Sequence, residues 1–135
     1  MKRINVGVIG VGWVGGIRAN ACAHNGIVNQ LHIAEIDPKR QVEIAEETGA
    51  ASMTDNWQSL IADDSIDVMV ISMTPETKRY PMVMAALEAG KHVFVEKPIA
   101  PTIEEAEQAY ALADAKGLKI SIGYSRRFDP RYVYV

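Results

Sequence analysis

A glycine-rich turn near the amino terminus constrains this chain more than any other part of its sequence. Residues 6–16 read V-G-V-I-G-V-G-W-V-G-G, and Gly10, Gly12 and Gly15 match the spacing G-x-G-x-x-G. The turn follows an apolar run, 4–9, that is typical of a buried strand, and a helical pattern follows the turn. Such glycines permit a tight turn, close approach of a pyrophosphate, and packing of helix on strand. A glycine turn can also have a structural role alone, so other parts of the sequence have to show whether this one binds a dinucleotide.

Size, composition and charge narrow the class of protein. The chain has 135 residues, 48% of them hydrophobic and 23% charged, which is the balance of one globular domain with a single core. The net charge of −3 provides no basic surface for nucleic acid or anionic lipid, and no apolar run approaches the ~18 residues of a membrane span. The single cysteine, Cys22, excludes an internal disulfide, and we expect a soluble protein of the reducing cytoplasm. Cys22 and His24 do not share a helix face, so we predict no metal site.

Strand-like and helix-like segments alternate along the chain, with short connections between them. The expected strands are 4–9, 31–36, 51–53, 66–72, 92–95 and 118–122. The expected helices are 14–24, 38–48, one capped by Asp55 and ending near 62, one from 75 to a stop at 90, and one capped by Thr102 and ending at 116. This alternation predicts an α/β fold, a doubly wound parallel six-stranded sheet (Rossmann) in the order 3-2-1-4-5-6. Residues 1–123 would form this dinucleotide-binding domain, and 124–135 would begin a linker to a further, substrate-binding domain.

An acidic residue about 20 positions beyond the glycines would hydrogen-bond the adenosine ribose. That distance from Gly15 leads to Glu35, at the end of the second strand. A carboxylate there would repel a 2′-phosphate, and Ile36 cannot bind one, so we expect NAD rather than NADP. The neighbouring Lys39 and Arg40 weaken this preference. Glu35 could also be only a solvated strand end, and Asp37 suits a helix cap better than a ribose ligand.

Residues that could carry chemistry follow the fourth and fifth strands. Ligands of open α/β sheets bind at the carboxyl ends of the strands, where Thr74-Pro75 and Glu96-Lys97-Pro98 lie. Lys97 is the strongest candidate, because partial desolvation could tune its amine as a general acid or base near a nicotinamide. The plainer alternative is a surface lysine at the end of a strand.

Four stretches together resemble the nucleotide-binding half of the glucose–fructose oxidoreductase / inositol dehydrogenase / MocA family. They are the glycine turn, A-E-I-D-P at 34–38, G-K-H-V-F-V-E-K-P at 90–98 and G-Y-S-R-R-F-D-P at 123–130. The resemblance covers essentially the whole chain, and E-K-P at this place is a specific marker of the family. It implies an NAD-dependent oxidoreductase that passes hydride between a sugar or polyol hydroxyl carbon and nicotinamide.

The resemblance also implies roles for individual residues. Lys97 would assist proton transfer, Glu96 and Pro98 would shape the nicotinamide pocket, Thr74 and Pro75 would line the cofactor path, and Arg127 would lie near the nicotinamide. Trp13 could cover the pyrophosphate or simply pack. Lys97 is thus the candidate catalytic residue, and the candidate cofactor-binding residues are Gly10, Gly12, Trp13, Val14, Gly15, Glu35, Asp37, Thr74, Pro75, Glu96, Lys97, Pro98 and Arg127.

Two departures from the family pattern leave alternatives open. Arg79 stands where the family commonly has a histidine, five residues after the T-P threonine. Family members also run well past 300 residues, and their second half binds substrate and usually forms the oligomer interface. We therefore expect a fragment, a truncated product or a natural stand-alone domain, which binds NAD with negligible activity of its own. The alternatives are a non-catalytic NAD-binding regulatory domain and a structural stub whose tail, 132–135, docks on another chain.

Overall fold

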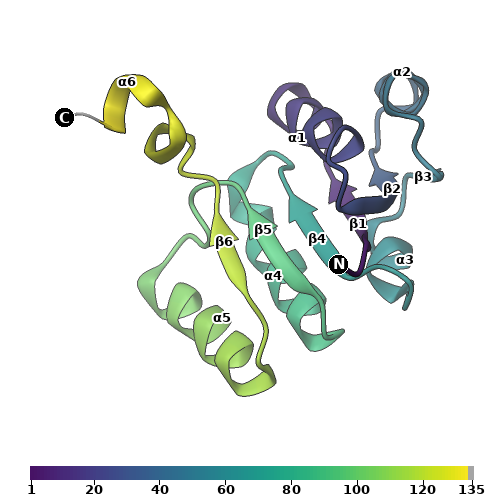
Figure 1. Cartoon of the computed structure of the whole chain (residues 1–135). Coiled ribbons are helices and arrows are strands. Elements are labelled where there is room, and N and C mark those ends of the chain that lie inside the picture. Colours follow the sequence, from purple (N-terminus) through teal and green to yellow (C-terminus); the bar gives the residue numbers. More distant parts are fainter. Residues whose placement is uncertain (134–135) are drawn as a thin grey trace.

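The computed structural model describes residues 1–133 and shows one sheet of six parallel strands in the order β3-β2-β1-β4-β5-β6 (Figure 1). The strands are β1 (Ile4–Ile9), β2 (Val28–Ala34), β3 (Ser52–Thr54), β4 (Val68–Ile71), β5 (His92–Val95) and β6 (Ile120–Ile122). The helices are α1 (Trp13–Ala23), α2 (Pro38–Thr48), α3 (Trp57–Ala62), α4 (Arg79–Glu88), α5 (Ile103–Lys116) and α6 (Pro130–Val133), with 3-10 turns η1 (Glu76–Lys78) and η2 (Ser125–Phe128). The predicted fold and strand order are confirmed.

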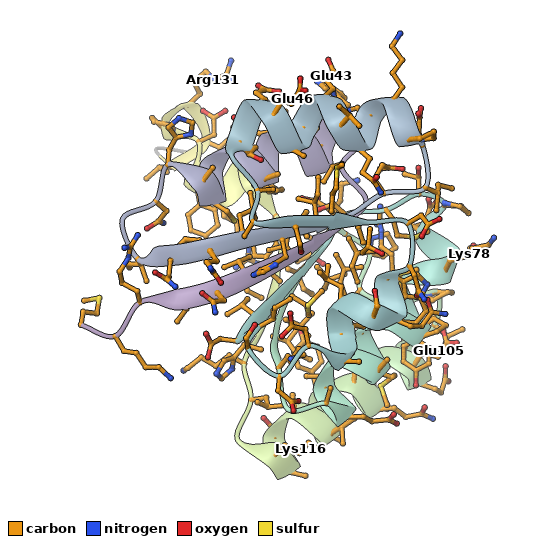
Figure 2. All side chains as sticks on the ribbon, turned by 90° about the vertical axis from the view of Figure 1, so that its right-hand side faces the viewer. Glu43, Glu46, Lys78, Glu105, Lys116 and Arg131 are labelled. Atoms are coloured by element: carbon orange, nitrogen blue, oxygen red, sulfur yellow. The ribbon has the colours of Figure 1, made fainter. Side chains whose placement is uncertain are left out.

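Helices cover both faces of the sheet, because the central strands are apolar on both sides. On one face, Val8 of β1 and Ile33 of β2 pack with Ile44 of α2 and with α1. On the other face, Met69 and Leu87 belong to a second core shared by α3, α4 and α5. In Figure 2, α2, which carries the labelled Glu43, lies on one side of the sheet, and α5, which carries the labelled Lys116, lies on the other. The sheet therefore exposes only its edges and the two ends of its strands.

The strand limits differ from the prediction where pairing overrides the apolar pattern. The second strand begins at Val28, three residues before the predicted start at 31, because Val28 pairs with Ile4 and Gln30 pairs with Asn5. It also ends at Ala34, so Glu35 lies one residue beyond it. The third strand is shifted by one residue to Ser52–Thr54, and the fourth and sixth, predicted as 66–72 and 118–122, are shorter. Polar residues join a strand here because a neighbouring strand satisfies their backbone groups.

The helix caps follow local side-chain chemistry. Asp37 accepts from the backbone N–H groups of Lys39 and Arg40, and Thr102 and Glu105 form the predicted capping box. The prediction that Asp55 caps the next helix is wrong. The cap is Asn56, whose side-chain oxygen accepts from the backbone N–H groups of Gln58 and Ser59. The helix predicted from residue 75 begins as the turn η1 and becomes α-helical only at residue 79.

The chain leaves the sheet after β6. Figure 1 shows η2 and α6 beyond the end of β6, away from α5. Tyr134 and Val135, which belong to the predicted linker and to the predicted docking tail, lie outside the described residues. Within residues 1–133, no helix has both the length and the hydropathy needed to span a membrane.

Candidate functional site

A cleft of about 660 Å³ runs across the carboxyl ends of the strands. This is where open α/β sheets bind ligands. The cleft brings together most of the candidate residues predicted from the sequence: Gly10, Gly12, Trp13, Val14, Gly15, Glu35, Asp37, Thr74, Glu96 and Lys97. It is also lined by residues that were not predicted as site residues: Ile9, Ala34, Ile36, Asp55, Trp57, Ser72, Met73, Arg79 and Met82.

The glycine turn forms one wall of the cleft. Gly10 has φ of 79°, and a Cβ there would lie 2.5 Å from the Cα of Met73, so only glycine fits. A Cβ on Gly15 would overlap the carbonyl oxygen of Gly10. Gly12, in contrast, has nothing within 4 Å of where its Cβ would stand. The turn is thus closed on its protein side and open at Gly12 toward the cleft, which fits a bound pyrophosphate.

The start of α1 presents free backbone donors to the same space. Gly12 caps α1 without a side-chain hydrogen bond, and the helix begins at Trp13. The first N–H groups of a helix have no partner within the helix, and together with its dipole they favour an anion. The Trp13 side chain is 83% exposed, so the alternative that it packs into the chain is not supported.

Glu35 is fixed at the β2 end of the cleft by three backbone donors. Its Oε2 accepts from the Val11 N–H at 2.8 Å, and its Oε1 accepts from the N–H groups of Ile36 and Asp37 at 2.9 and 3.1 Å. A carboxylate offers about four acceptor sites, so the side chain retains capacity for a hydroxyl donor. Asp37 lines the cleft too, but its carboxylate caps α2.

Arg40 braces the glycine turn from α2. Its Nε donates to the Val11 carbonyl at 2.8 Å and its Nη2 donates to the Gly12 carbonyl at 3.1 Å, while Nη1 pairs with Glu43 at 2.9 Å. The guanidinium is therefore engaged with the turn and with a carboxylate. Sequence reasoning treated Arg40 only as a nearby positive charge. Contacts across 28 and 29 residues left no local signal that could have revealed this bracing.

A partly buried ion pair lies at the β5 end of the cleft. Glu96 is 8% exposed, and its Oε1 accepts from Nε and Nη2 of Arg18 at 2.9 and 2.6 Å. Arg18 also lies over the Phe94 ring, 5.0 Å from the centroid. A Cβ on Gly123 would come within 2.7 Å of the same carboxylate oxygen. Glu96 thus ties the helix of the glycine turn to the end of β5 and packs closely against Gly123 after β6.

Arg79 connects the ends of β4 and β5 under the cleft. It is 6% exposed, its Nε donates to the Met73 carbonyl at 2.8 Å, and its Nη1 donates to the carbonyls of Lys97 and Glu96 at 2.7 and 3.4 Å. Burial lowers the pKa of Arg79 from its ordinary value, and the charges of Glu76 and Glu96 oppose that shift. The sequence marked Arg79 only as a departure from the family pattern, and no local signal indicated this role.

The other candidate residues differ in whether they line the cleft. Lys97 lines the cleft with an exposed side chain, so the described part of the chain does not provide the partial burial expected for it. The Thr74–Pro75 and Lys97–Pro98 peptide bonds are cis, and neither proline is among the lining residues. Arg127, on η2, is exposed, lies over the Tyr124 ring at 5.6 Å and does not line the cleft.

Comparisons with known proteins place this chain among relatives of known class. The family model described as "Oxidoreductase family, NAD-binding Rossmann fold" matches residues 4–124. Inositol 2-dehydrogenase of Rubrobacter xylanophilus is 32% identical over 136 residues, covering 99% of this chain and 39% of that protein. The scyllo-inositol 2-dehydrogenase (NADP(+)) of Bacillus subtilis is 29% identical over 132 residues, covering 98% of this chain and 36% of that protein.

A solved structure shows the same arrangement. The crystal structure of scyllo-inositol dehydrogenase from Lactobacillus casei with bound NAD(H) and scyllo-inositol matches with a TM-score of 0.88 and 30% identity. The match covers 98% of this chain and 39% of that one. The chain thus spans 39% or less of the length of these three relatives. With its glycine turn, its strand order and a family match over nearly all of its length, this chain belongs to the oxidoreductase family with an NAD-binding Rossmann fold.

Proposed function

We propose that this chain binds NAD in the cleft and serves as the cofactor-binding part of a dehydrogenase that acts on a sugar or polyol hydroxyl. The observation that carries the proposal is that the glycine turn, Glu35 and Lys97 line one cleft at the carboxyl ends of the strands. The substrate class follows from relatives named for inositols. When bound, NAD supplies the hydride acceptor.

Each group of residues has a distinct task in this proposal. The backbone N–H groups at the start of α1 hold the pyrophosphate, and the open space at Gly12 admits it. Glu35 accepts hydrogen bonds from the adenosine ribose hydroxyls. Lys97, exposed at the end of β5, assists transfer of the proton of the substrate hydroxyl. Arg79 fixes the backbone carbonyl of Lys97, and so fixes where that side chain starts.

The preference for NAD over NADP depends on Glu35. The carboxylate is held by three backbone donors, so it cannot swing aside to admit a 2′-phosphate without breaking those bonds. Arg40 is occupied by the glycine turn and Glu43, and is not free to neutralise such a phosphate. We expect NAD to bind at least about tenfold more tightly, which corresponds to roughly 1.5–3 kcal/mol for a lost charge-assisted bond and a like-charge contact.

Calorimetric titration of the chain with NAD and NADP tests both parts of the proposal. Binding of NAD should be saturable, and Glu35→Ala should narrow the difference between the two nucleotides. Glu46→Ala is the matched control, because Glu46 is a carboxylate on α2 that does not line the cleft (Figure 2). Equal or tighter binding of NADP by the unaltered chain contradicts the assigned preference, and absence of binding for both nucleotides contradicts the cofactor role.

A further inference from the structure

The β4–β5 end of the cleft has an unbalanced charge. Three side chains with formal charge line it there, namely Arg79, Glu96 and Lys97. Glu96 acts on Arg79 as well, but it is already paired with Arg18 at 2.6 Å, so the Arg18–Glu96 pair adds little net field. Glu76 lies near Arg79, but its carboxylate is exposed to solvent on η1. Positive charge therefore predominates at this end.

Arg79 contributes to that charge differently from Lys97. Its guanidinium is 6% exposed and its hydrogen bonds go to backbone carbonyls, which orient it without neutralising it. A guanidinium stays protonated in proteins, and its interactions are strongest where water is excluded. Lys97 is exposed, so solvent screens its ammonium. Arg79 is thus the fixed charge that a ligand at this end meets.

The two redox states of the cofactor differ in charge at one place, the nicotinamide ring, which is cationic in NAD⁺ and neutral in NADH. Glu35 and the glycine turn assign the adenosine and pyrophosphate to the β1–β2 end, which leaves the nicotinamide for the end lined by Arg79 and Lys97. We infer that Arg79 makes this cleft bind NADH more tightly than NAD⁺, an inference that rests on the proposed cofactor function. By linkage, the bound NAD⁺ becomes easier to reduce than free NAD⁺.

The test compares the affinities for NADH and NAD⁺ by calorimetry in the unaltered chain and in four variants. Arg79→Met removes the charge, Arg79→Gln removes it but keeps a donor for the carbonyls, and Arg79→Lys keeps the charge with fewer donors. Arg3→Met removes an exposed guanidinium whose Nη2 donates to the carbonyl of Val28 at the amino end of β2, far from the cleft. Circular dichroism verifies the fold of each variant.

We expect the unaltered chain to bind NADH about tenfold more tightly than NAD⁺, the order given by two unit charges across a partly desolvated site. Arg79→Lys and Arg3→Met should keep most of that ratio, while Arg79→Met and Arg79→Gln should bring it within about twofold of unity. Equal affinities in the unaltered chain overturn the inference, as does an unchanged ratio in a folded uncharged variant. If Arg79→Met does not fold, the ratio of NADH to NAD⁺ affinity in Arg79→Gln tests the inference. If neither variant folds, the ratio in the unaltered chain tests it. Loss of binding for both nucleotides in the unaltered chain refutes the proposed function instead.

Discussion

The two ends of the cleft are built in different ways. At the β1–β2 end, Glu35 is held by backbone N–H groups of Val11 and of its own next two residues, all within one strand–helix–strand unit. At the β4–β5 end, the key contacts join distant elements: Arg18 reaches Glu96 across 78 residues. The hydrogen bonds of Glu35 therefore need only β1 and β2 to pair. The contacts of the second end join α1 and α4 to the ends of β4 and β5, so its geometry depends on side chains that no local pattern predicts.

The largest effect should come from closing the glycine turn on its protein side. In Gly15→Ala, the new Cβ overlaps the Gly10 carbonyl, so the turn or α1 must move. We expect a loss of about 3 kcal/mol in the free energy of unfolding, at the upper end for overpacking, together with loss of NAD binding. Urea unfolding followed by circular dichroism measures the first, and calorimetry the second. A stability change below about 1 kcal/mol would show that the turn adapts more readily than its contacts indicate.

A change on the open side of the same turn should separate binding from stability. In Gly12→Val, the side chain projects into space with nothing within 4 Å, where the pyrophosphate would lie. NAD affinity should fall by about 100-fold or more, because the isopropyl group fills the space that the pyrophosphate would occupy at the start of the helix. The midpoint of thermal unfolding should change little. Calorimetry and thermal unfolding measure the two effects. Unchanged NAD affinity in a folded variant would exclude the turn from the binding site.

A methyl group added at Gly123, far from the glycine turn, should destabilise the β4–β5 end of the cleft. In Gly123→Ala, the Cβ lies 2.7 Å from the Glu96 carboxylate, which is held in place by Arg18. We expect a destabilisation of about 1–2 kcal/mol by overpacking, measured by urea unfolding. The double variant with Glu96→Ala should show coupling, because the added methyl group then has no carboxylate to meet. Strictly additive free energies of unfolding would mean that the two residues act independently.

The smallest effect should come from loosening the brace on the first end. Arg40→Met removes two hydrogen bonds to the Val11 and Gly12 carbonyls and the ion pair with Glu43. It leaves the three hydrogen bonds of the Glu35 carboxylate in place. NAD affinity should fall about three- to tenfold, which corresponds to roughly one ordinary hydrogen bond, because the turn that holds the pyrophosphate becomes less ordered. Calorimetry measures the change, with Lys39→Met as the control, because Lys39 is exposed and does not line the cleft. Equal effects of the two variants would assign the loss to charge alone.

The sequence predicted the fold and one end of the site, because both depend on short-range signals. Alternating apolar segments and the Thr102–Glu105 capping box identified the elements, and the distance from Gly15 identified Glu35. Strand topology then placed Lys97 at the carboxyl end of β5 without any knowledge of its neighbours.

What the sequence missed depends on tertiary contacts. The bracing by Arg40, the Arg18–Glu96 pair and the clamp of Arg79 on the Lys97 carbonyl each join elements that meet only in the folded sheet. The cap at Asn56 rather than Asp55 is a smaller miss, because both side chains suit that position and the backbone geometry selects one.

The placement of the two tryptophans gives this protein a built-in optical label. The chain contains only Trp13 and Trp57, and both line the cleft. Trp13 is 83% exposed at the start of α1, whereas Trp57 is half-buried against the core at the start of α3. All indole emission from these 135 residues therefore originates at the cleft, with a solvated component and a shielded one. A nucleotide covering the glycine turn should quench or shift the solvated component first, so the emission spectrum can distinguish which part of the cleft is filled.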